Sequence, residues 1–256
     1  MMNLQCRTEL ASAYKAGSQI ARILTEEWCT RELYCAACAS NRLSPARANT
    51  PAIDFVCPEC EQSFQLKSLK TWNPRKIPDA AYDSMVRAIR ADKTPNLLVL
   101  QYSPDWLVLN LLLIPRMFFS ESTLEKRTPL SSRARRAGWV GCNILLGQIP
   151  EDGKITMVRN SSPTPESQVR DEFSRVRRLA EVPPSLRGWT VDVLNAIRGL
   201  GKSQFSLREL YECESPLKVL HPRNRNVRPK IRQQLQILRD LGLIEFTTPG
   251  NYALRS

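Results

Sequence analysis

Residues 54–67 hold the side chains whose types and spacing are best suited to chemistry. Asp54 lies on one apolar segment, and Gln65 and Lys67 lie on the next one as Gln-x-Lys. This spacing is typical of a Mg²⁺-dependent nuclease centre, although the pattern alone is frequent by chance. Asp54 would ligate Mg²⁺ directly, and the side-chain carbonyl of Gln65 and the backbone carbonyl of Leu66 would add oxygen ligands. Lys67 would orient or deprotonate the attacking water and steady the phosphate.

A hairpin must hold these groups together. The segments Ala52–Val56 and Ser63–Lys67 are expected to be its two strands. Alternation along the strands directs the three polar side chains to one face, opposite the apolar side chains that enter the core. On an expected first helix, Glu26 and Glu27 follow the apolar face. They are expected to be solvated helix charges, and the alternative is that one glutamate reaches the active site.

The same segment also carries half of a predicted metal site. Two C-x-x-C pairs give the spacing C-x2-C-x18-C-x2-C, which is formed by Cys35, Cys38, Cys57 and Cys60. Four soft ligands on two tight loops suit tetrahedral Zn²⁺, and the alternative is buried free thiols. A four-cysteine site with no open position is structural, so zinc would fix the hairpin rather than do chemistry. The other four cysteines are expected to be small core residues: Cys6, Cys29, Cys142 and Cys213.

Composition favours a polyanionic partner. The 256 residues include 37 Lys and Arg against 25 Asp and Glu, for a formal net charge of +12. This excess favours nucleic acid through phosphate contacts and counterion release, with a membrane surface as the alternative. No apolar run approaches the ~18 residues that span a membrane, and no signal peptide is evident, so we expect no membrane association and a cytoplasmic protein. The single histidine, His221, excludes His-pair metal nucleases and His-dependent triads.

The segments up to residue 182 predict an α/β domain. Ser18 is expected to cap a first helix and Asp79 a second one. Near-continuous apolar runs at Leu97–Tyr102 and Leu107–Ile114 suit strands that are buried on both faces. Helices that alternate with such strands indicate an α/β arrangement. The segment Glu181–Leu186, with its two prolines, is expected to link this domain to a second one.

A basic segment lies between the strands and this linker. Within residues 128–143, small residues surround Arg133, Arg135, Arg136 and Trp139. A basic loop with one aromatic side chain suits phosphate contacts together with a ring that lies against a base. The alternative is that Trp139 packs in the core.

Residues 187–256 predict a winged helix, a variant of the helix-turn-helix. Thr190–Ile197 is an amphipathic helix, Ser206 caps a second helix, and Asn226 opens a third one that Gly242 closes. A short hairpin around a Pro-Gly turn follows. Side chains that pair with phosphates and base edges lie on the outward face of the third helix: Arg228, Lys230, Arg232, Gln233, Gln236 and Arg239. A solvated basic face on a dimerising winged helix is the alternative.

Several specific runs resemble the family of DpnI-like, methyl-directed type II restriction endonucleases. They are Asp54-Phe55, Leu66-Lys67-Ser68, both cysteine pairs, the runs at residues 135–139 and 141–144, Arg187-Gly188-Trp189-Thr190 and residues 231–236. The resemblance covers nearly the whole chain in order. It implies a PD-(D/E)xK endonuclease domain with structural zinc over residues 1–182 and a winged-helix DNA-binding domain over residues 187–256. It further implies that both domains bind double-stranded DNA at GATC with N6-methyladenine and that the duplex is cut. By the same resemblance, Trp139 lies against the adenine methyl groups.

One position departs from the family's pattern, which has Glu where this chain has Gln65. A neutral amide keeps a carbonyl ligand but removes one negative charge, so Mg²⁺ should bind more weakly. The leading hypothesis, from the whole-chain resemblance and the Asp54, Gln65 and Lys67 pattern, is a Mg²⁺-dependent endonuclease that acts as a monomer or a transient dimer on DNA. The first alternative is a methyl-DNA-binding protein or regulator that has lost cleavage through Gln65. The second is a zinc-ribbon, winged-helix transcription factor with no nuclease ancestry.

Overall fold

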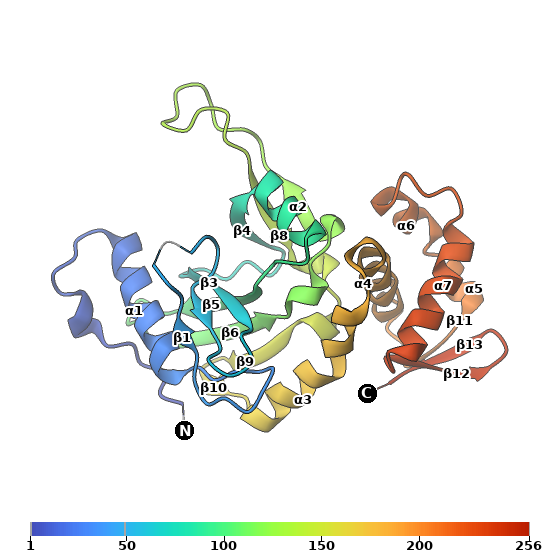
Figure 1. Ribbon diagram of the computed structural model, residues 1–256, viewed down its shortest axis with the longest axis horizontal. Coiled ribbons are helices and arrows are strands. Elements are labelled where there is room, and N and C mark those ends of the chain that lie inside the picture. The colour runs from blue at the N-terminus through green and yellow to red at the C-terminus, as the bar shows by residue number, and fades with distance from the viewer. Residues whose placement is uncertain (1, 49, 256) are drawn as a thin grey trace. The chain divides into compact units, whose positions relative to one another are not determined.

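The computed structural model describes residues 2–48 and 50–255 (Figure 1). Its contacts divide the chain into two compact units. The first unit comprises the residues up to Asn73 together with Pro95–Arg116 and Gly153–Ser174. The second unit comprises Pro74–Thr94, Met117–Asp152 and the residues from Arg175 onwards. The chain therefore enters the second unit well before residue 182, the predicted end of an endonuclease domain.

A seven-stranded sheet forms the centre of the first unit. Its strand order is β1-β2-β3-β5-β6-β9-β10, and the pairing of β3 with β5 is the parallel one among the described strands. The bounds are Ser44–Pro45, Phe55–Val56, Ser63–Leu69, Asn96–Tyr102, Val108–Ile114, Ile155–Arg159 and Ser162–Pro163, in that order. The side chains of Leu97–Leu100 on β5 are at most 1% exposed. Both predicted strands form, as β5 and β6, and burial on both faces is confirmed for β5. Strand β6 is buried only in part, because Leu109, Asn110 and Leu112 are half-buried.

Helix α1 (Gly17–Glu32) packs against β3 of this sheet. It buries Leu24 and Trp28, and the hydroxyl of Ser68 on β3 donates to the hydroxyl of Thr25 at 2.8 Å. The prediction that Ser18 caps α1 is wrong. The N-cap is Ala16, whose carbonyl already accepts the amides of residues 19 and 20, because its extended backbone begins the helix two residues earlier. The unit also contains η1 (Thr8–Ala11) and most of α3 (Glu166–Val176).

The second unit contains a small antiparallel sheet of order β4-β8-β7, with α2 (Tyr82–Arg90) after its first strand. Its strands are Lys76–Ala81, Gly141–Leu145 and Leu124–Lys126, in that order. The prediction that Asp79 caps α2 is wrong, because β4 continues to Ala81, which pairs with Gly141 and is itself the N-cap. Short 3₁₀ segments connect the remaining parts: Arg116–Phe118, Glu121–Thr123, Leu146–Gln148, Glu151–Gly153 and Arg177–Glu181.

The C-terminal part of this unit is a winged helix. Its helices are α4 (Pro184–Gly199), α5 (Leu207–Tyr211), α6 (Glu214–Leu220) and α7 (Val227–Asp240). Its three-stranded sheet has the order β11-β13-β12, formed by Gln204–Ser206, Asn251–Leu254 and Ile244–Thr248. The predicted start and stop residues are confirmed: Ser206 forms a capping box with Glu209, Asn226 precedes α7, and Gly242 takes a φ of +79°. The short elements α6 and β11 were not predicted.

The predicted linker is instead the start of α4. Pro184 is the first helical residue, where its missing N–H costs nothing. One turn later, the guanidinium of Arg187 is 4% exposed and donates to the carboxylate of Asp92 at 2.7 Å. Its Nε and Nη2 also donate to the carbonyl of Val182 at 3.0 and 2.9 Å. The segment around the two prolines is therefore tightly fixed within the second unit.

Replacing Arg187 by methionine should lower the free energy of unfolding by about 1 to 3 kcal/mol, because the half-buried carboxylate of Asp92 and the buried carbonyl of Val182 lose this donor. The exposed pair of Arg178 with Glu181 offers a matched control. Replacing Arg178 by methionine should change the same free energy by no more than about 0.5 kcal/mol. Chemical denaturation of both variants measures the difference, and equal effects would contradict the structural role of Arg187.

Candidate active site and basic surfaces

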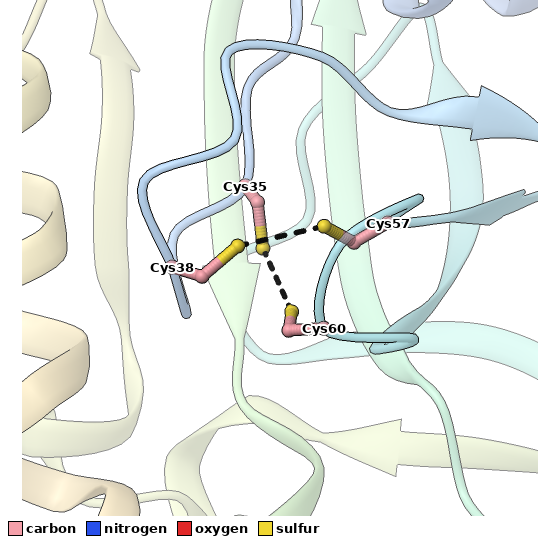
Figure 2. A group of neighbouring side chains, drawn as sticks. All are labelled: Cys35, Cys38, Cys57 and Cys60. Atoms are coloured by element: carbon pink, nitrogen blue, oxygen red, sulfur yellow. Dashed lines mark hydrogen bonds between the residues drawn. The ribbon is translucent and has the colours of Figure 1, made fainter.

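Four cysteine thiols meet at one point of the first unit (Figure 2). Their sulfur atoms all lie within 4.8 Å of one another, and the Sγ atoms of Cys35 and Cys60, and of Cys38 and Cys57, are 3.6 Å apart. A tetrahedron with metal–sulfur bonds of about 2.3 Å has edges of about 3.8 Å. The predicted grouping of the four cysteines is thus confirmed, and its geometry is compatible with structural zinc.

Backbone amides of the two loops donate to the cysteine sulfurs, whereas burial raises the pKa of the thiols of Cys35 and Cys60. The amides of Ala37 and Ser40 donate to the sulfurs of Cys35 and Cys38, at 3.3 and 3.5 Å. At Cys57, burial raises the pKa, but hydrogen bonds from the backbone of the second loop outweigh it and lower the pKa to about 7. Among the other cysteines, Cys6, Cys29 and Cys142 are buried as predicted, whereas Cys213 is only half-buried.

Helix α3 holds the first cysteine loop in place. Its Arg170 donates to the carbonyls of Cys35 and Ser40, both at 3.2 Å. The same guanidinium lies 5.1 Å from the centre of the Tyr34 ring. The cluster therefore joins the end of α1, the β2–β3 turn and α3, so its geometry governs the position of the hairpin that bears Asp54.

Asp54 is fixed directly on the backbone of β3. Its carboxylate accepts the amide of Leu66 at 2.7 Å, and its own amide donates to the carbonyl of Phe64 at 2.9 Å. Phe55 also pairs with Phe64, so the register is irregular at Asp54. The alternation that predicted one shared face for Asp54, Gln65 and Lys67 is interrupted there.

A cavity of about 610 Å³ lies beside Asp54. Strand β3 contributes Leu66 and Ser68 to its wall, and Lys70 follows them. Helix α1 contributes the other side of the wall: Gly17, Ser18, Ala21, Arg22, Thr25 and Glu26. The carboxylate of Glu26 accepts Arg22 Nε at 2.7 Å within this lining. The alternative role for a glutamate of the first helix, that it reaches the candidate active site, therefore has structural support.

The other two predicted catalytic side chains, Gln65 and Lys67, alternate along β3 with Leu66 and Ser68, the two residues of this strand that line the cavity. Gln65 is 8% exposed and Lys67 is half-buried, and the two stand opposite Leu97 and Val99 of β5 in the register. The structure thus brings Asp54 to the peptide unit that joins Gln65 to Leu66, but the Gln65 and Lys67 side chains do not line the cavity.

The basic segment between β7 and β8 forms a long loop of the second unit that projects beyond the strands (Figure 1). The side chains of Arg133, Arg135 and Arg136 are exposed on it. Trp139 is half-buried rather than part of the core, and the guanidinium of Arg136 lies 4.9 Å from its ring centre. A Cβ on Gly141 would lie 2.7 Å from this ring, so glycine is required for the observed indole position.

The predicted outward face of α7 is exposed, apart from Lys230. Arg228, Arg232, Gln233 and Gln236 are exposed, whereas Lys230 is half-buried, which lowers its pKa. The opposite face is buried and includes Gln234, which accepts the hydroxyl of Thr190 on α4 at 2.7 Å. The polar face of α7 is thus open to solvent, with Arg228 paired with Glu214 at 2.7 Å and Arg232 donating to the hydroxyl of Tyr211 at 3.0 Å.

A larger cavity, of about 1060 Å³, borders the loop before α7. The loop is anchored by His221, which bonds the buried carboxylate of Asp192 at 2.7 Å and stacks on Trp189. Exposed Arg223 and Arg225 line its mouth and make no ion pair among the residues described. Sequence reasoning missed this basic surface, although the run His-Pro-Arg-Asn-Arg-Asn directly precedes the predicted helix.

Comparison with known families agrees with this organisation. A family model described as DpnI, the Dam-replacing family, matches residues 2–182. The chain belongs to the Dam-replacing family. A second model, described as the Dam-replacing HTH domain, matches residues 185–254, so the two matches together cover nearly the whole chain. The resemblance to DpnI-like enzymes with a C-terminal helix-turn-helix domain is thereby confirmed.

Membership of the Dam-replacing family supports a restriction nuclease, and the helix-turn-helix domain indicates DNA binding. The fold agrees with the predicted class: a mixed α/β core with a four-cysteine cluster, followed by a winged helix. Among the described residues, no helix is both long enough and apolar enough to cross a membrane.

Proposed function

We propose that this protein is a type II, methylation-dependent restriction endonuclease that cuts double-stranded DNA at GATC sites with N6-methyladenine and requires Mg²⁺. The observation that carries the proposal is the cavity beside Asp54 in a chain whose whole length matches the Dam-replacing family. Its chemistry is hydrolysis of a phosphodiester, with water as the nucleophile. We further propose action in the cytoplasm, as a monomer or a transient dimer on DNA.

The oxygen donors around the cavity suit a hard cation that prefers oxygen ligands, such as Mg²⁺. The Asp54 carboxylate would be a direct ligand and the Leu66 carbonyl a neutral one. The Gln65 amide oxygen, predicted as a further neutral ligand, would have to turn toward the cavity, which its side chain does not line. Bound Mg²⁺ supplies charge neutralisation on the phosphate and lowers the pKa of the attacking water. Lys67 would then hold or accept the proton of that water and steady the phosphate oxygens. The catalytic trio Asp54, Gln65 and Lys67 remains a prediction that activity must test.

Two surfaces of the second unit would contact DNA. The projecting loop offers Arg135 and Arg136 to phosphates and Trp139 to the adenine methyl groups, supported by its partial exposure and by the glycine that leaves room for it. The polar face of α7 would enter the major groove, where guanidinium and amide groups pair with guanine and adenine edges. Its contributors are Arg228, Lys230, Arg232, Gln233 and Gln236.

We propose that the four thiolates bind Zn²⁺ and that this zinc has no catalytic role. Four protein ligands leave no open coordination position for water or substrate. Its function would be to fix the β2–β3 turn relative to α1 and α3, which are joined at the cluster by Arg170.

A matched pair of supercoiled plasmids tests the activity. With Mg²⁺, a plasmid that carries N6-methylated GATC should be cut, and its unmethylated twin should remain intact. If neither is cut, and Gln65→Glu does not bring about cutting, the enzyme proposal fails. A methylation-dependent gel shift without cleavage at high Mg²⁺ would then establish the alternative, a methyl-DNA-binding protein that has lost cleavage through Gln65. That alternative is favoured by one observation, the neutral Gln65 side chain.

A further inference from the structure

The proposed magnesium site lacks negative charge if it is built only from the predicted trio. Asp54 supplies its one carboxylate, and Gln65 is neutral. The affinity of oxygen sites for divalent cations depends on the number of charged ligands, so a single carboxylate with neutral carbonyls binds Mg²⁺ weakly. In addition, the Gln65 side chain does not line the cavity that Asp54 borders. A second carboxylate from elsewhere in the chain would supply the missing negative charge and a ligand that lines the cavity.

Glu26 is the other carboxylate that lines this cavity. It comes from α1, which is held against β3 by the hydrogen bond between Ser68 and Thr25 and by the complete burial of Trp28. Helix and strand are therefore fixed relative to each other on both sides of the cavity. The neighbouring Glu27 has a different role: it pairs with Arg31 at 3.1 Å and with Arg7 at 3.5 Å.

Arg22 lines the same cavity as the two carboxylates. Its Nε donates to the Glu26 carboxylate at 2.7 Å. The guanidinium is thus the counter-ion of Glu26 inside the cavity, a position that a divalent ion would take. This side chain is mostly exposed, so it can swing into solvent when an ion with higher charge density binds.

We propose that Glu26 supplies the second carboxylate of the metal site and so compensates for the neutral Gln65, with Arg22 as the cation it releases. The inference rests on the proposed function, because the metal is the one that cleavage requires. The metal site then keeps two carboxylate ligands, and the second one comes from α1 instead of from β3. A direct consequence is that Glu26, and not Gln65, governs metal affinity.

Mn²⁺ binding to the DNA-free, zinc-loaded protein tests this, with free Mn²⁺ measured by electron paramagnetic resonance. Glu26→Gln should raise the Kd at least ~10-fold, because one of two charged ligands is lost. Gln65→Glu in the Glu26→Gln background should recover little of the loss, because the side chain at position 65 does not line the cavity. Glu172→Gln is the matched control, since Glu172 lies outside the cavity lining, accepts a hydrogen bond from Gln168 on α3 and should leave the Kd unchanged.

The competing cation gives a second test that does not depend on how Glu26→Gln folds. Arg22→Met should tighten Mn²⁺ binding, because Glu26 is then free of its partner. An unchanged Kd for folded Glu26→Gln, or for Arg22→Met, would overturn the inference.

Cleavage of the methylated plasmid, measured in parallel, separates this inference from the proposed function. Loss of Mn²⁺ affinity in Glu26→Gln with a wild-type protein that never cuts would support the metal site and overturn the enzyme. If the wild-type protein cuts and Glu26→Gln does not change the Mn²⁺ affinity, the enzyme proposal is supported and the role of Glu26 in the metal site is overturned.

Discussion

Replacing Lys67 by alanine should lower the rate of cleavage of methylated DNA by about 10³-fold or more, because a group that handles the proton of the attacking water and stabilises the phosphate is lost. The affinity for methylated DNA should change by less than about threefold, since the basic loop and α7 are untouched. Single-turnover cleavage and gel shift on one methylated duplex measure the two quantities separately.

The cleavage rate of Lys70→Ala should be compared with that of Lys67→Ala. Lys70 follows β3 by one residue and lines the cavity beside Asp54, which Lys67 does not. If Lys70→Ala abolishes cleavage and Lys67→Ala does not, the catalytic lysine belongs to the cavity and the predicted Gln-x-Lys assignment is wrong. Lys93→Ala, an exposed change after α2, should leave the rate unaltered and controls for charge removal in general.

Cys57→Ser should unfold the first unit under conditions in which the wild-type protein is stable. Structural zinc in small domains contributes about 10–16 kcal/mol of binding free energy near neutral pH, which becomes folding free energy when the unfolded chain forms no site. The lost ligand also releases the β2–β3 turn, and with it Asp54. We expect less than one zinc per chain, a lower melting temperature, and loss of cleavage together with weaker DNA binding.

Cys213→Ser is the matched control for this change. Its thiol lies outside the cluster and is half-buried, so zinc content and melting temperature should match those of the wild-type protein. Removal of zinc with a strong chelator should reproduce the Cys57→Ser result. Wild-type secondary structure and DNA affinity in metal-free protein would contradict a structural role for the cluster.

The predictable features of this chain are those that depend on local chemistry. The four cysteines meet because each C-x-x-C pair forms its own loop, and Ser206 and Glu209 form a capping box because their spacing allows it. The strands β5 and β6 follow from near-continuous apolar runs. In each case, a short sequence pattern identifies the element, although the meeting of the two cysteine loops is itself a long-range contact.

The features that could not be predicted depend on packing between distant segments. Whether Glu26 is solvated or reaches Asp54 depends on how α1 lies on β3, which the helix sequence does not encode. The irregular register at Asp54 arises where the chain enters a two-residue strand, and no turn residue announces it. Likewise, Ser18 and Asp79 are good capping residues, but the preceding backbone had already begun the helix or continued the strand.

No single cut in this chain releases either compact unit intact. The backbone passes from one unit to the other at residues 73/74, 94/95, 116/117, 152/153 and 174/175, so each unit is assembled from separate stretches. A protease that nicks one of these junctions leaves at least one fragment with pieces of both units. Likewise, one recombination crossover between relatives would mix the cores of both parents. The two units are expected to be inherited, exchanged and degraded together.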